Sequence, residues 1–163
     1  MMNRKVVVTS LVAFLIAFIA ARAMQREQAP AVTQVTDDAA LQAELTMERP
    51  IEALNSIWIE ELTWIEIRDR MADGTNTVII PTGGIEQNGP YVAMGKHNYV
   101  LQGACEGIAR ELGNALCAPI VKLVPEGGIE EPTGHMRYPG TISLREETFQ
   151  EVLDDVASSL QAH

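Results

Sequence analysis

The sequence predicts an α/β fold built on a parallel sheet, and three observations lead to this prediction. After about residue 57, short β-branched apolar runs alternate with segments of helical periodicity. Two long glycine-rich loops each follow one of the apolar runs. The expected order is helix, strand, loop, helix, strand, loop, helix, which is typical of parallel sheets with crossover helices. Both loops should then lie at the carboxyl ends of the strands, where ligand sites form in such sheets.

The first residues predict a targeting segment. Arg4 and Lys5 precede an almost unbroken apolar run at 6–21, and Ala-Arg-Ala at 21–23 offers a cleavage site for a signal peptidase. The run is shorter than the roughly 20 residues that a membrane-spanning helix needs. We therefore assign residues 1–23 to a signal peptide and expect a periplasmic or other extracytoplasmic protein. An uncleaved anchor at 6–21 is the alternative, and it would be the only contact with a membrane.

Residues 24–56 read as a linker, and residues 57–163 as the folded domain. Within the linker, Asp37 or Asp38 can cap a short helix at 39–48, which should stop before Pro50. The net charge of −10 excludes the broad basic surface that nucleic-acid binding requires, so no nucleic acid is expected as a partner.

The first half of the domain has clear local signals. Thr63 is the expected N-cap of a helix at 64–72, with Glu66 completing a capping box and Gly74 following the end of the helix. The run at 77–80 lacks alternation between apolar and polar residues, which predicts a strand buried on both faces.

The second half repeats the pattern. Asn98 is the expected N-cap of a helix at 99–112, with Gly113 after its end. A strand at 118–124 should follow, and Ser143 is the expected cap of a last helix at 145–160. That last helix carries an apolar stripe at helical spacing: Val152, Leu153, Val156 and Leu160.

The two cysteines leave two interpretations open. An oxidising compartment would permit a disulfide between Cys105 and Cys117. The interpretation we favour from the sequence is two separate, buried, small apolar residues, one in the helix at 99–112 and one at the start of the following strand. Their spacing fits no metal-binding motif.

Both loops carry polar groups at one end of the expected sheet, and those of the first loop can bind a metal ion. In the first loop, Glu86 and His97 could reach one ion, because glycines bend the backbone between them. The second loop adds His135 and three glutamates at the same end of the sheet, and we expect at least two of these glutamates to face water. They are Glu126, Glu130 and Glu131.

Two motifs resemble the creatininase (creatinine amidohydrolase) family. Residues 78–90, VIIPTGGIEQNGP, resemble the family's signature, and residues 135–144, HMRYPGTISL, resemble its second characteristic segment. The aromatic start at 58–64 also fits, so the resemblance covers about residues 57–163. It implies αβα layers around a mostly parallel sheet, incomplete in this chain because no strand follows the last helix.

The resemblance also implies a metal-dependent hydrolase of a non-peptide C–N bond, in an amide or a cyclic amide. Glu86 matches the family's first metal ligand, and His97 stands where the family has a metal-bridging Asp; both would be catalytic. Asn88, Tyr91 and His135 would contact the small-molecule substrate. The implied cofactor is a divalent metal, zinc first and manganese second, and the implied assembly is a homo-oligomer.

The departures from the family pattern modify these expectations. Asn88 and Tyr91 replace two histidines of the signature, and His97 replaces a carboxylate that can bridge two ions. We therefore expect a single-metal site held by Glu86, His97 and a later ligand from a segment that this sequence does not contain. The alternative function is an inactive α/β binding module, or a truncated fragment, with the same fold.

Overall fold

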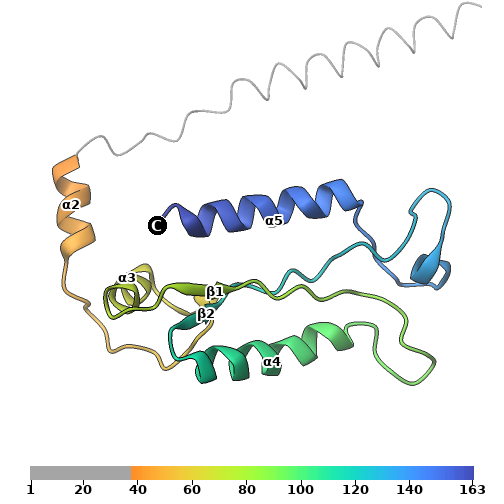
Figure 1. The fold of residues 1–163 in the computed structure, drawn as a ribbon, viewed down its shortest axis with the longest axis horizontal. Helices are drawn as coiled ribbons and strands as arrows, with labels where there is room; N and C mark the ends of the chain where they lie inside the picture. The colour runs from red at the N-terminus through yellow and green to blue at the C-terminus, as the bar shows by residue number, and fades with distance from the viewer. Residues whose placement is uncertain (1–37) are drawn as a thin grey trace, which may run out of the picture. The chain divides into compact units, whose positions relative to one another are not determined.

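The computed structural model describes residues 38–163 (Figure 1). The chain divides into two compact units, with the boundary between Met47 and Glu48. Helix α2 (Asp38–Thr46) belongs to the first unit and agrees with the short helix expected at 39–48. The predicted signal peptide or anchor at 1–23 lies outside the described residues, and the domain boundary at residue 57 stays a prediction. Within residues 38–163, no helix combines the length and hydropathy needed to cross a membrane.

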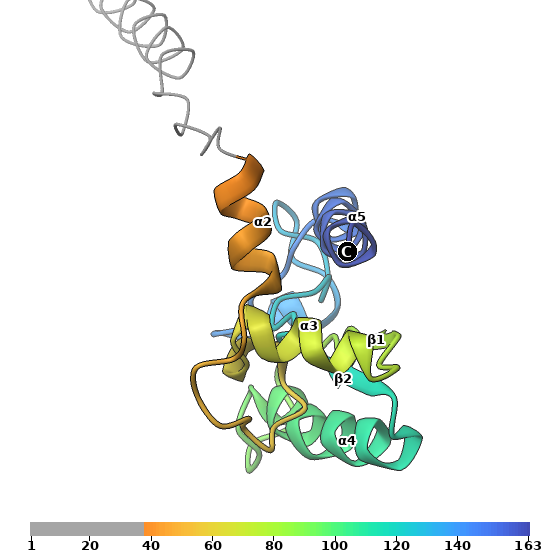
Figure 2. The same cartoon turned by 90° about the vertical axis from the view of Figure 1, so that its left-hand side faces the viewer.

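A parallel pair of strands lies at the centre of the second unit. Strand β1 (Thr77–Ile79) pairs with β2 (Ala115–Cys117), and Val78 lies opposite Leu116. Helix α4 (Lys96–Leu112) covers one face of this sheet and α5 (Glu146–Gln161) lies on the other (Figures 1 and 2). The α/β fold with parallel strands and αβα layers is thus confirmed.

The second strand begins earlier than the sequence predicts. We expected it at 118–124, whereas the regular ladder ends at Cys117 and only an isolated bridge from Val121 to Thr82 continues it. Pro119, which has no N–H to donate, falls in this gap. The burial expected for the run at 77–80 is found in β2 instead, because all three residues of β2 are buried whereas β1 is only half-buried. Strand β2 also pairs along its other edge with the segment at Trp58.

Local capping rules predict α3 (Trp64–Ala72) to the residue. The side chain of Thr63 accepts a hydrogen bond from the Glu66 N–H, and the Glu66 carboxylate accepts one from the Thr63 N–H at 2.8 Å. This carboxylate is also buried and accepts a bond from the Leu54 N–H at 2.5 Å. It therefore joins the helix start to the incoming chain. Donation from the Leu54 N–H, and then from the Thr63 N–H and hydroxyl, lowers the pKa of Glu66 to about 2.

This lowered pKa predicts a specific acid sensitivity. Between about pH 4.5 and about pH 2 the unfolded chain binds a proton at Glu66 that the folded chain does not, so acid favours unfolding. The stabilisation is complete above this window and disappears as the pH falls through it. We expect Glu66→Gln to flatten the fall in melting temperature across this window. Glu60→Gln, on an exposed glutamate of the 3-10 helix η1 (Ile59–Glu61), is the control; equal slopes for Glu66→Gln and the control would contradict this role.

Two expected caps have other functions in the structure. The N-cap of α4 is Gly95 and not Asn98, whose buried amide accepts from the Gly84 N–H and donates to the Gly84 carbonyl, both at 3.2 Å. The N-cap of α5 is Arg145 and not Ser143, whose hydroxyl accepts from the Glu126 N–H at 2.8 Å. Both side chains therefore connect the glycine-rich loops to residues that are distant in sequence.

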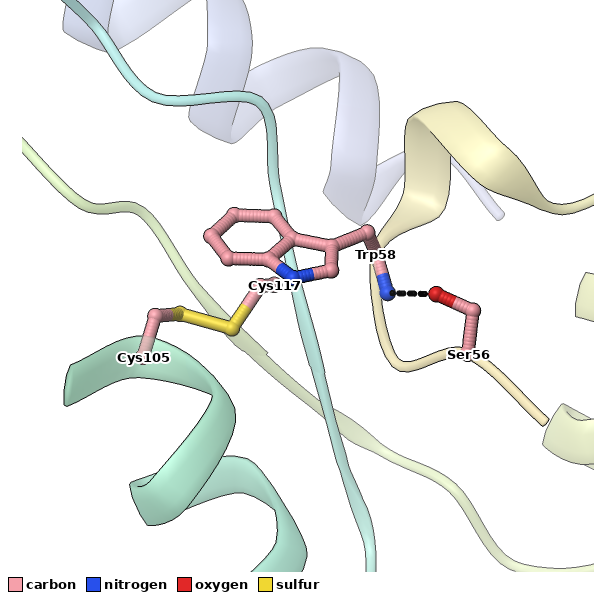
Figure 3. The surroundings of a disulfide bond; sticks show 4 residues. All are labelled: Ser56, Trp58, Cys105 and Cys117. Carbon is pink, nitrogen blue, oxygen red and sulfur yellow. Dashed lines mark hydrogen bonds between the residues drawn. A yellow bond between two sulfur atoms is a disulfide. The ribbon is translucent and has the colours of Figure 1, made fainter. Parts of the chain in front are cut away.

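The preference for separate cysteines is wrong, because Cys105 and Cys117 form a disulfide between α4 and the end of β2 (Figure 3). Both residues are almost fully buried, as expected. The bond lies in the core between α4 and the sheet, with Trp58 packed against it. It thereby fixes α4 to the central strand.

Helix α5 packs more loosely than α4. None of its residues is fully buried, and Val152 of the predicted apolar stripe is exposed. A largely apolar hollow of about 340 Å³ lies where Leu160 approaches β1, β2 and α3. The core of this unit consequently lies on the α4 side of the sheet.

Candidate metal centre

Backbone hydrogen bonds bring the two glycine-rich loops together beyond the strands. The Gly83 N–H donates to the Val121 carbonyl at 2.9 Å, and the Ile142 N–H donates to the Ile85 carbonyl at 3.0 Å. Asn98 holds Gly84 between these two links. The Glu86 side chain therefore projects from the first loop close to the place where the second loop is bonded to it.

The second loop folds tightly around Gly127. This residue has φ +136°, and a Cβ there would collide with the Thr133 carbonyl, so only glycine fits. The turn places His135, at the start of the 3-10 helix η2 (Gly134–Arg137), beside Glu126, and the His135 N–H donates to the Glu126 carbonyl at 3.1 Å. Two side chains that can bind metal thus project from one closed loop.

The Glu86 carboxylate lies between two imidazoles. Its Oε1 is 2.6 Å from Nε2 of His97, and its Oε2 is 3.1 Å from Nε2 of His135. The Glu86 side chain is 14% exposed, whereas the two imidazoles are 40% and 42% exposed. The structure therefore brings together Glu86, His97 and His135, all three of which the sequence singled out, and it leaves both rings accessible to solvent.

Glu126 is the site residue that sequence reasoning did not select. Glu86, Glu126 and His135 each offer one ligand atom, and these three atoms lie within 4.8 Å of one another. Gly84 makes this possible, because a Cβ on that residue would occupy the space of the Glu126 carboxylate. The available signal was position: Glu126 comes directly after the second expected strand, at the same edge of the sheet as Glu86.

The two carboxyl groups have opposite pKa shifts. Desolvation is the largest influence on Glu86 and raises its pKa, but hydrogen bonds with Glu126 and His97 and the charges of both histidines outweigh it, so the pKa is lowered. Desolvation, and then the hydrogen bond and negative charge of Glu86, raise the pKa of Glu126. In the metal-free protein Glu126 therefore keeps its proton after Glu86 has lost its own.

Glu86, His97, Glu126 and His135 form the Glu86 cluster. The remaining predicted site residues lie outside it. Asn88 accepts from Nζ of Lys96 at 2.6 Å and donates to the Glu86 carbonyl at 3.0 Å, so its amide supports the loop. The Tyr91 side chain is almost fully exposed. The expected substrate contacts of Asn88, Tyr91 and His135 stay predictions. Glu130 and Glu131 are exposed, as expected for two of the three glutamates in the second loop.

The cluster fits a divalent cation by the chemistry of its donors. Carboxylate oxygen and imidazole nitrogen are ligands of zinc, and a catalytic zinc site uses three protein ligands and leaves one position open. Glu86 is largely shielded from solvent and the two imidazoles are more exposed, so the site is closed at Glu86 and open at the imidazoles.

Comparison with known proteins gives consistent matches. The family model for creatininase, described as creatinine amidohydrolase, matches residues 60–163. The chain is 29% identical to the creatinine amidohydrolase of Pseudomonas putida over 108 residues, which is 66% of this chain and 41% of that protein. It is 27% identical to the 3-dehydro-scyllo-inosose hydrolase of Thermotoga maritima over 110 residues, covering 68% of this chain and 32% of that protein. The chain thus spans about two fifths or less of the length of these curated relatives.

Solved structures agree with these relatives. The fold resembles that of a mutant creatininase described as the Zn-Zn type, with a TM-score of 0.60 and 28% identity over 68% of this chain and 42% of that one. It also resembles a structure described as creatininase Mn, with a TM-score of 0.58 and 29% identity over 66% of this chain and 41% of that one.

Proposed function

Because this chain belongs to the creatininase family, we propose that the protein hydrolyses a non-peptide C–N bond of a small amide or cyclic amide with a divalent metal ion. The observation that carries the proposal is the Glu86 cluster, in which two imidazoles and a second carboxyl group surround one sheltered carboxylate. Glu86, Glu126 and His135 come from the two loops and His97 comes from the start of α4. Both loops follow the carboxyl ends of parallel strands, the usual position of a ligand site in this class of fold.

Glu86 and neighbours drawn from His97, His135 and Glu126 would hold the ion. We propose zinc first and manganese second, because similar solved structures are described with these metals. A bound divalent metal lowers the pKa of a coordinated water and polarises the carbonyl group of the substrate.

The protein's own residues would orient groups and carry protons. His97 holds Glu86 in one orientation through the 2.6 Å contact, and its partly exposed ring is accessible to a substrate. We propose that His97 takes the proton from the attacking water and returns it to the departing nitrogen of the amide. The loop bonds of Asn98 and Asn88 would keep Glu86 in place during this step.

An inactive α/β binding module is the second candidate function. Asn88 and Tyr91, which replace two histidines of the family signature, favour it. Such a module would bind a small amide without turnover and without stoichiometric metal. Metal analysis of the purified protein therefore separates the two candidates.

We also propose export and self-association. The buried disulfide supports an oxidising compartment, and the N-terminal apolar run supports a targeting segment at 1–23 or an anchor at 6–21. Cell fractionation with thiol alkylation tests the location: the protein should be extracytoplasmic with both cysteines blocked from alkylation. A reduced, cytoplasmic protein would contradict export. For assembly we propose a homo-oligomer.

The test of the hydrolase uses chelator-treated protein to which zinc or manganese is restored. Candidate substrates are creatinine, which the name of one relative includes, and other cyclic amides. The compound named for the other relative, 3-dehydro-scyllo-inosose, contains no C–N bond, and its turnover in place of any amide would contradict the proposed reaction. We expect turnover of a cyclic amide that disappears with the chelator and returns with the metal. Stoichiometric metal without turnover of any amide would contradict the proposed reaction, and amide binding without metal would favour the binding module.

A further inference from the structure

The arrangement around Glu86 distinguishes two ways of holding an ion. The sequence suggested Glu86 with His97, completed by a ligand from another segment. The structure offers a set of three within the chain itself, since atoms of Glu86, Glu126 and His135 lie within 4.8 Å of one another. Among residues 38–163, this is the group of three or more His, Cys, Asp or Glu side chains whose ligand atoms are close enough together to share one ion. His97 is not part of this group.

We propose that Glu86, Glu126 and His135 together bind a single divalent cation and that His97 positions Glu86 without binding the ion. This inference rests on the proposed metal-dependent function and adds the identity of the ligands. It also makes the two loops of this chain sufficient for a three-ligand site with one open position, as in catalytic zinc sites.

The two oxygens of Glu86 support this division of roles. Oε1 faces Nε2 of His97 at 2.6 Å, a distance typical of a strong hydrogen bond, while Oε2 faces Nε2 of His135 at 3.1 Å. A carboxylate that binds a metal is normally held by a further hydrogen bond, which fixes its orientation. His97 supplies this bond from the start of α4, leaving Oε2 on the side of His135.

Charge supports the same ligand set. The carboxyl groups of Glu86 and Glu126 lie side by side and are partly buried, so a cation placed between them is attracted by both. One divalent cation neutralises both carboxylates, whereas an ion between Glu86 and His97 would leave Glu126 uncompensated. A Cβ on Gly84 would occupy the space of the Glu126 carboxylate, so the lack of a side chain at Gly84 lets Glu126 approach Glu86.

The test measures zinc affinity by competition with a chromogenic chelator, using the metal-free full chain and zinc alone. We expect Glu126→Gln and His135→Ala each to weaken binding at least about 100-fold. His97→Gln keeps an N–H donor for Glu86, so its loss should lie at about 10-fold, the lower end of the roughly 10–100-fold range for residues that support a ligand. Glu131→Gln, a matched change on an exposed glutamate of the same loop, should leave the affinity unchanged.

The same variants separate the inference from the proposed function. His97→Gln should retain zinc but lose turnover if His97 carries the proton, while the two ligand variants should lose both. A loss of zinc affinity in His97→Gln as large as in His135→Ala, with Glu126→Gln unchanged, would overturn the ligand assignment alone. Failure of the unmodified protein to bind zinc at any concentration tested would overturn the metal-dependent function as well. Circular dichroism confirms folding, and His135→Ala tests the assignment independently if Glu126→Gln does not fold.

Discussion

Glu86→Gln should abolish metal-dependent turnover and weaken zinc binding more than any other single substitution in the cluster. The substitution preserves the shape of the side chain but removes the negative charge that lies between His97 and His135. It replaces a charged proposed ligand by a neutral amide and weakens the charge-assisted hydrogen bond with His97, so we expect a loss beyond the roughly 10–100-fold that changes to supporting residues cause. Calorimetric titration with zinc and a steady-state assay with a cyclic amide measure the two effects.

A matched glutamate controls for the general effect of removing one negative charge. Glu130 is exposed and forms only a long, solvent-accessible ion pair with Arg145 at 3.4 Å, which contributes little to stability. Glu130→Gln should therefore retain zinc binding and turnover. Turnover by Glu86→Gln at the level of this control would show that the chemistry takes place elsewhere in the protein.

Removal of the disulfide should produce the largest loss of stability. The bond joins residues separated by 12 positions, and a loop of this size stabilises a folded protein by about 3 kcal/mol in the chain-entropy model. The double variant Cys105→Ala/Cys117→Ala also leaves small gaps in the core beside Trp58. For a domain of this size we expect the melting temperature to fall by roughly 10 °C, measured by thermal circular dichroism.

Reductant provides the control for the disulfide. Dithiothreitol should lower the melting temperature of the unmodified protein towards that of the double variant, and it should not affect the double variant itself. Zinc binding at temperatures where the double variant is folded should persist, because neither cysteine belongs to the Glu86 cluster. A double variant as stable as the parent would show that the bond contributes nothing to the folded state.

Features set by neighbouring residues could be predicted from the sequence. The capping box of Thr63 and Glu66 defines the start of α3, and Gly113, with φ +73°, follows the end of α4 as expected. The alternation of strands and helices correctly indicated a parallel sheet. These signals are local, because each depends on groups a few residues apart.

Features that depend on contacts between distant segments could not be predicted in the same way. Asn98 and Ser143 are good N-cap residues, and their type alone does not reveal that they bind Gly84 and Glu126 instead. The pairing of Cys105 with Cys117 requires that α4 pack against β2. Glu126 looked like its solvated neighbours until the two loops were placed together.

Anomalous diffraction at the zinc edge, from crystals of the metal-loaded full chain, tests the central claim most directly. We predict one strong peak at about 2.0–2.2 Å from an oxygen of Glu86, an oxygen of Glu126 and Nε2 of His135, with His97 bonded to Glu86 and not to the ion. A peak at another place in the protein, or crystals saturated with zinc that show no peak at these residues, would contradict the account.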